Sequence, residues 1–124
     1  MVIHNFRTVA SLLFKRVAGR IIALKQFSWF KPQEMSNISW AYATAGEPNP
    51  FLFKRFANHI IVLKDLNGFK PQANIVWAYA TAGEPNPRLF TRSADYVIAL
   101  KDLKGVNTQN LSIIIWAYAT AGQS

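Results

Sequence analysis

The 124-residue sequence contains no cysteine, which excludes disulfide bonds and metal sites built on thiolates. His4 and His59 are its only histidines, too few for a zinc site. The most apolar stretch, Ser112–Gly122, has about half of the ~20 residues that a membrane-spanning helix needs. Glycine-rich phosphate loops, G-x-S-x-G, H-E-x-x-H and paired carboxylates are also missing. We therefore expect no enzymatic activity, no metal or cofactor, no small-molecule substrate and no membrane partner.

Acidic residues are scarce, with six against fourteen lysines and arginines, and the formal net charge is +8. Such a charge favours a polyanionic partner such as RNA, DNA or anionic lipid. The first acidic residue is Glu34, and the basic stretch before it has the composition of an organellar transit peptide. Most of this stretch matches later copies of a repeat, so only Met1–Ser11 remain as a candidate targeting remnant. The predicted location is a mitochondrion or a plastid.

The repeat is the strongest feature of the sequence. The heptapeptide WAYATAG occurs three times, at spacings of 37 and 39 residues, in Trp40–Gly46, Trp77–Gly83 and Trp116–Gly122. A second block, LFKR in its first two copies and LFTR in the third, recurs in Leu13–Lys25, Leu52–Lys64 and Leu89–Lys101. The period is therefore about 39 residues, with two residues missing between Gln72 and Trp77. We place this loss at the start of a helix, which preserves the register from Trp77 onward.

Each repeat is predicted to contain two helices. Helix A spans about Gln33–Ala45 in the first complete copy, with Pro32 or Pro71 in its first turn and Gly46 or Gly83 as a left-handed C-cap. Helix B begins after an Asn-Pro pair, Asn49-Pro50 or Asn86-Pro87, and ends at Asn67-Gly68 or Lys104-Gly105. Helix B is amphipathic, with Leu52, Phe56 and Ile60 on its apolar side. Helix A has no charged face, so we expect it to be covered on more than one side.

The predicted fold is all-α, a single domain over residues 1–124 that forms an α-α superhelix (solenoid) of about three helix-pair repeats. The expected units are roughly residues 12–29, 30–68, 69–105 and 106–124, of which the first and the last are partial.

The unit FKPQEMSNISWAYATAG, Phe30–Gly46, resembles the octotricopeptide-type repeats of algal and diatom organellar proteins. It is also similar to the helical repeats of FAST kinase-like proteins that carry a RAP domain. The resemblance covers nearly all of Leu12–Gly122 and implies a right-handed solenoid. It further implies binding of organellar RNA and a role in RNA processing, stability or translation. Thr108 and Ile113 depart from the pattern, since earlier copies have proline and asparagine at these positions.

Several residues are candidates for contacts with single-stranded RNA. Asn37 and Asn74 lie three residues before a tryptophan and are suited to base-edge hydrogen bonds, or alternatively are merely exposed or capping side chains. Ser39 varies between copies, which indicates either specificity or tolerance. Five basic residues are candidates for phosphate contacts, or alternatively belong to a solvated outer face: Lys31, Lys70, Lys54, Arg55 and Arg92.

The aromatic residues of WAYATAG are identical in all three copies. The tryptophans could stack on bases, but we favour a framework role for them and for the tyrosines between the helix layers. These structural residues are Trp40, Trp77, Trp116, Tyr42, Tyr79 and Tyr118.

The predicted function is therefore binding of single-stranded RNA. The alternatives are a protein–protein interaction scaffold of the solenoid type and a fragment without independent function. Because neither end of the repeat array has a polar capping helix, self-association through the ends is a further hypothesis.

Overall fold

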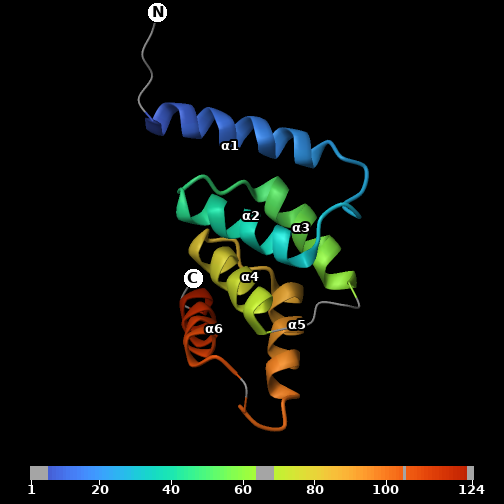
Figure 1. The fold of residues 1–124 in the computed structure, drawn as a ribbon, viewed down its shortest axis with the longest axis vertical. Coiled ribbons are helices and arrows are strands. Elements are labelled where there is room, and N and C mark those ends of the chain that lie inside the picture. The colour runs from blue at the N-terminus through green and yellow to red at the C-terminus, as the bar shows by residue number, and fades with distance from the viewer. Residues whose placement is uncertain (1–5, 64–68, 105, 123–124) are drawn as a thin grey trace, which may run out of the picture.

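The computed structural model describes residues 6–63, 69–104 and 106–122. Within these ranges the chain is all-α, with six helices and no strand, as predicted (Figure 1). Their bounds are α1 Phe6–Ile22, α2 Pro32–Thr44, α3 Pro50–Val62, α4 Phe69–Thr81, α5 Pro87–Ile98 and α6 Thr108–Ala121. Helix A of the repeat corresponds to α2, α4 and α6, and helix B corresponds to α1, α3 and α5.

The helices are arranged in two rows. In the first row α2 packs along α4 and α4 along α6; in the second, α1 contacts α3 and α3 contacts α5. Contacts of α2 with α3 and of α4 with α5 join the rows. The chain thus descends pair by pair from α1 and α2 to α5 and α6 (Figure 1). None of the described helices is both long and apolar enough to cross a membrane.

The ends of α2 and α4 and the starts of α3 and α5 follow the predicted caps. Gly46 and Gly83 have φ angles of 69° and 71°, and both end helix A in a left-handed turn. The backbone N–H of Glu47 donates to the backbone carbonyl oxygen of Tyr42 at 3.0 Å, which is the longer of the two hydrogen bonds in a Schellman motif. At the start of α3, the Asn49 side-chain oxygen accepts hydrogen bonds from two backbone N–H groups in the first turn. The capping signals were therefore predicted correctly.

The missing residue pair is absorbed at the start of α4, as predicted, and Pro71 stays in the first turn. Helix α4 begins at Phe69, so Pro71 is its third residue, whereas Pro32 is the first residue of α2. Proline is tolerated at both positions because the first four N–H groups of a helix have no intrahelical partner. Both helices keep 13 residues, and the tryptophan is the ninth residue of α2, α4 and α6 alike. The register at Trp77 is preserved, as predicted.

Helix B ends earlier than predicted. Helix α3 stops at Val62 and α5 at Ile98, whereas the prediction extended both to the Asn-Gly and Lys-Gly pairs. Residues 67–68 and Gly105 lie outside the described residues. At the other end of the chain, α1 begins at Phe6, so residues 6–11 of the candidate targeting remnant are helical, and residues 1–5 are outside the described ranges.

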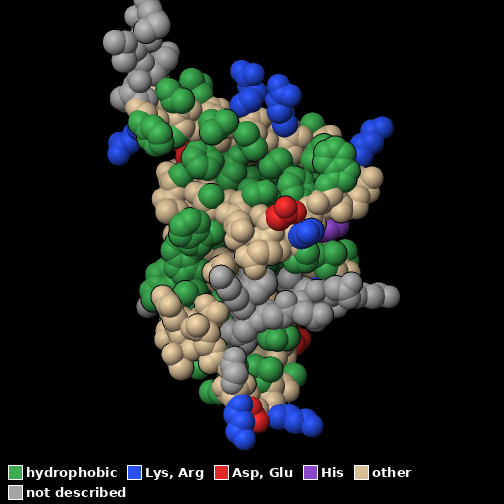
Figure 2. Space-filling view, viewed as in Figure 1, with side chains coloured by type: hydrophobic (Ala, Val, Ile, Leu, Met, Phe, Trp, Pro, Cys, Tyr) green, Lys and Arg blue, Asp and Glu red, His purple; other side chains and the backbone are tan. Residues whose placement is uncertain are grey.

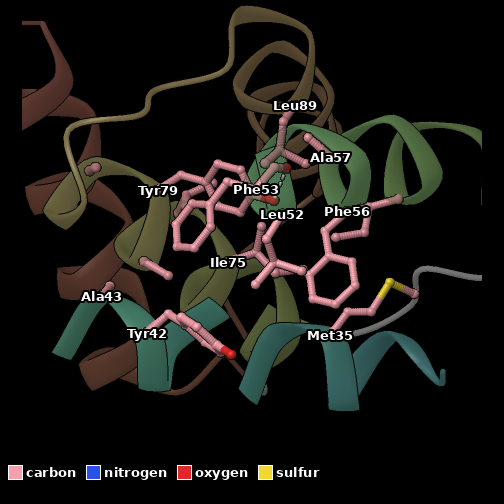
Figure 3. Packing of buried hydrophobic residues seen from close by; sticks show 14 of the residues in the cluster. Met35, Tyr42, Ala43, Leu52, Phe53, Phe56, Ala57, Ile75, Tyr79 and Leu89 are labelled. Carbon is pink, nitrogen blue, oxygen red and sulfur yellow. Dashed lines mark hydrogen bonds between the residues drawn. The ribbon is translucent and has the colours of Figure 1, made fainter. Parts of the chain in front are cut away.

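The core lies between the two rows of helices (Figure 3). Leu52, Phe56 and Ile60 of α3 are fully buried, which confirms the predicted apolar side of helix B. In α4 the buried residues follow almost without a break, as expected for a helix covered on more than one side: Ala73, Ile75, Val76, Ala78, Tyr79 and Ala80.

Candidate nucleic-acid interface

The three tryptophans of WAYATAG form a ladder across α2, α4 and α6. The ring centroids of Trp40 and Trp77 are 6.1 Å apart with an interplanar angle of 32°. Those of Trp77 and Trp116 are 6.4 Å apart at 30°. The end rings remain 46% and 47% exposed. The tryptophans therefore pack against one another across the helices, as favoured from the sequence, and the two end side chains are still about half exposed.

The spacing of the ladder limits what it can bind. A base inserted between two rings needs about 7 Å, twice the ~3.4 Å rise per nucleotide. Both centroid distances, 6.1 and 6.4 Å, are shorter than this. Insertion of a base between neighbouring tryptophans is thus excluded in this arrangement, and a nucleic acid would contact the exposed parts of the rings instead.

Asn37 and Asn74 occupy the same helical face as this ladder, one turn before their tryptophans. Asn37 is exposed and Asn74 is half-buried. The Gln33 side-chain N–H donates to the side-chain oxygen of Asn37 at 2.9 Å. The side-chain N–H groups of Asn37 are therefore the part of this amide that could donate to a ligand. Thr44 is exposed one turn after Trp40. The tryptophan row is accordingly an uncharged surface of amide, indole and hydroxyl groups.

The prediction for Ser39 is wrong. Its side chain is fully buried, as is Val76 at the same position of α4. In α6, Ile115 holds this position and is 62% exposed. The residue before the tryptophan is therefore buried in α2 and α4, each of which is followed by another helix A. It is exposed in α6, which has no following helix A in the described part of the chain. Ser39 varies between copies because it is a packing position, and it is not accessible to RNA.

The structure gives Arg55 and Arg92 a structural role that the sequence did not reveal. Arg55 Nη1 donates to the carbonyl oxygens of Ile22 and Leu24, the latter at 2.7 Å, and its guanidinium carbon lies 4.4 Å from the Phe27 ring centroid. Arg92 repeats the arrangement at the end of α3, where it donates to the oxygens of Ile60 and Leu63. Each guanidinium thus binds carbonyls at the C-terminal end of the preceding helix B, where intrahelical donors are lacking. We leave both arginines out of the candidate interface.

Of the candidate lysines, the structure describes the side chains of Lys31 and Lys54, and neither lies on the helical segment that carries a ladder tryptophan with its asparagine. Lys31 is exposed just before α2, and its backbone N–H donates to the Glu34 carboxylate at 2.8 Å. Lys54 is exposed on α3 and lines a shallow pocket with Glu84. The side chain of Lys70 lies outside the described residues. On the face shown in Figure 2, basic side chains are scattered around the periphery and form no continuous stripe.

The tyrosines of WAYATAG hold helix A against helix B of the preceding unit. Each hydroxyl donates to a backbone oxygen of the preceding helix: Tyr42 to Phe14 at 2.7 Å, Tyr79 to Phe53 at 2.6 Å and Tyr118 to Phe90 at 2.5 Å. Burial, which penalises the phenolate, raises the pKa of all three, that of Tyr118 to about 12. Because these hydroxyls stay neutral and are already bonded to the framework, they are not ligands.

The part of the chain that the structure describes contains no cluster of three or more His, Cys, Asp or Glu residues that could hold a metal. What remains as a candidate interface is the tryptophan row on α2, α4 and α6, with Asn37 and Asn74. Comparison of the chain with protein-family models, with curated proteins and with solved structures found no match.

Proposed function

We propose that the chain is a short right-handed α-α solenoid that binds single-stranded RNA in an organelle and acts in RNA processing, stability or translation. Three contacts that recur at equivalent positions support the solenoid arrangement. They are the tryptophan ladder, the tyrosine bond to the preceding helix B, and the arginine bond to its C-terminal carbonyls. A unit that repeats both its sequence and its contacts to the next unit is the basis of a solenoid.

The observation that carries the RNA proposal is the pairing of Asn37 with Trp40 and of Asn74 with Trp77 on neighbouring helices. Each amide has N–H groups that can donate to acceptors on base edges, and packing of α2 along α4 places the two amides on neighbouring helices. The exposed parts of the indoles add apolar contact area. The net charge of +8 supplies long-range attraction to the phosphates.

The direct test is fluorescence polarisation of the full chain with a labelled mixed-sequence single-stranded RNA over a salt series. Phosphate contacts release counterions, so the logarithm of the association constant should fall linearly with the logarithm of salt concentration. The expected slope is about −0.7 per phosphate neutralised. Absence of binding at the lowest salt overturns the proposal.

The contribution of the tryptophan row to RNA affinity is tested with the double variant Asn37→Ala, Asn74→Ala. We expect at least roughly tenfold weaker binding with little change in the salt slope, since hydrogen bonds to base edges typically contribute about 1–3 kcal/mol of discrimination. Asn58→Ala is the matched control, because Asn58 is also exposed but lies on α3, outside the row. Equal losses for the double variant and the control would contradict recognition by the row.

A protein-interaction scaffold is the second candidate. It is favoured by large aromatic side chains that are strongly exposed outside the ladder: Phe6 at 88%, Trp29 at 77% and Phe51 at 71%. The two arginines committed to backbone carbonyls also reduce the basic groups available to phosphates. If the chain fails to bind RNA at low salt, this candidate becomes the preferred one.

A further inference from the structure

Equivalent positions of helix B differ sharply in burial along the chain. Leu52 in α3 and Leu89 in α5 are fully buried, whereas Leu13, which holds the same position in α1, is 61% exposed. Phe56 is likewise fully buried, and its equivalent Val17 is 37% exposed. The helices α3 and α5 each have a preceding helix B to pack on. The exposed side of α1 therefore presents the face that its two copies bury against a neighbour.

The opposite end of the array shows the complementary pattern on helix A. Ile115 of α6 is 62% exposed, whereas Ser39 and Val76 at the same position are fully buried by the next helix of the row. Trp116 is 47% exposed at this end of the ladder, and Trp40 is 46% exposed at the other end. The two outer faces are thus the two halves of one interface, which already occurs twice within the chain.

The hydrogen-bonding contact between an arginine and the end of the preceding helix B also has one of its halves at each end of the chain. Arg16 holds the position of Arg55 and Arg92, and it is exposed on α1. The acceptors of Arg92 are the oxygens of Ile60 and Leu63 at the end of α3, and the equivalent residues at the end of α5 are Val97 and Leu100. One end of the molecule therefore carries the donor, and the other end carries the corresponding carbonyls.

We propose that a second copy of this chain stacks head to tail on the first, with α1 and α2 of one copy covering α5 and α6 of the other. In this contact Leu13 is buried, Arg16 binds the carbonyls that end α5, and Trp40 extends the ladder beyond Trp116. The occupant is a second copy because the internal interface joins units of the same sequence in the same way. The inference rests on the proposed solenoid arrangement but not on RNA binding. Since the two faces differ, the contact is heterologous and leaves one free copy of each face in a dimer, so oligomers grow with concentration.

Sedimentation velocity of the RNA-free full chain, from low micromolar to several hundred micromolar, tests the proposal. The unmodified chain should shift progressively to dimers and larger species. Leu13→Glu removes one face and Ile115→Glu the other, and each should weaken association at least tenfold. Both side chains are mostly exposed in the single chain, so circular dichroism should show unchanged helix content.

Leu12→Glu is the matched control. Leu12 is 60% exposed, but its equivalents Phe51 and Arg88 are exposed as well, so this position is not part of the repeated interface. The control should associate like the unmodified chain.

A mixing experiment gives the sharpest result. The Leu13→Glu chain keeps its α6 face, and the Ile115→Glu chain keeps its α1 face. An equimolar mixture of the two should therefore form dimers, and no larger species, at concentrations where each alone is monomeric. An unmodified chain that stays monomeric throughout, or a mixture that stays monomeric, overturns the proposal. RNA binding that fails while stacking persists would refute only the proposed function.

Discussion

Replacement of Arg55 by alanine distinguishes between two roles of this residue, stabilisation of the fold and binding of a phosphate. In the structure, Arg55 donates to the carbonyl oxygens of Ile22 and Leu24 and lies over the ring of Phe27. It thereby ties the middle of α3 to the end of α1 and to the segment that follows α1. If this is its main role, Arg55→Ala lowers the free energy of unfolding, whereas a phosphate ligand would be lost without a change in stability.

The expected magnitude follows from the contacts. A hydrogen bond from a charged donor contributes about 1.5–3 kcal/mol, and a partly exposed cation–π contact about 0.5–1 kcal/mol. One guanidinium serves all these contacts and Arg55 is only half-buried, so we expect a combined loss of about 2–3 kcal/mol, less than the sum. For a chain of this size the melting temperature should then fall by roughly 10 °C. Arg55→Lys should recover only part of the loss, because an ammonium lacks the planar fork of guanidinium donors.

The assay is urea denaturation followed by circular dichroism, with Arg16→Ala as the control. Arg16 holds the same repeat position and is exposed on α1, so at low protein concentration its replacement should change the stability by no more than about 0.5 kcal/mol. Equal stabilities of Arg55→Ala and Arg16→Ala would refute the structural reasoning. A weaker RNA affinity of Arg55→Ala at unchanged stability would restore the phosphate interpretation.

Three further predictions concern the tyrosines and the caps. Burial raises the pKa of Tyr42, Tyr79 and Tyr118 above the ordinary value near 10. The contribution of the neutral side chains to the free energy of unfolding is therefore complete below about pH 10. It is lost as the pH rises through the pKa values of the folded state. Tyrosinate absorbance should show delayed ionisation coupled to unfolding; titration of all tyrosines near pH 10 with the helices intact would contradict this. Gly83→Ala should cost about 1–2 kcal/mol by urea denaturation, because φ is 71° while nothing lies within 4 Å of the added Cβ, which makes the cost purely conformational. Asn49→Ala should cost about 1 kcal/mol through loss of the α3 cap, and an unchanged stability would show that the two bonds to its side chain contribute nothing.

The features predicted correctly from the sequence are those encoded over a few residues. The left-handed Gly46 and Gly83 and the capping Asn49 each act within one helical turn, so the local sequence is sufficient to place them. The sequence did not show that α4 begins two residues earlier, relative to its proline, than α2 does, because the FKPQ segment is compatible with either a loop or a first turn. The tryptophan keeps the same position in each helix because α4 packs against α2 and α6, and this position is compatible with a start of α4 at Phe69.

The candidate site was less predictable because its assignments depend on contacts between units. Arg55 lies 31 residues from Leu24, whose oxygen it binds, and nothing local distinguishes a guanidinium aimed at a carbonyl from one aimed at solvent. Ser39 was misassigned for a related reason. A polar residue that varies between copies has the pattern of a specificity position, and only the placement of α4 shows that this side chain is covered.

Repetition itself explains why identity between copies could not separate framework from ligand positions. A residue can recur because every unit must contact the next one, as Arg55 and Arg92 do, or because every unit offers the same group to a ligand. The two causes differ in burial: interface positions are covered wherever a neighbour is present, as Leu52 and Leu89 are, whereas ligand positions must stay accessible even in the middle of the array. In α4, which has neighbours on both sides, Trp77 and Asn74 are only half-buried, while Val76 is fully covered. A ligand that ran along the whole array would therefore find Trp77 and Asn74 accessible on α4, and in α6 it would meet Ile113 at the position of the asparagine.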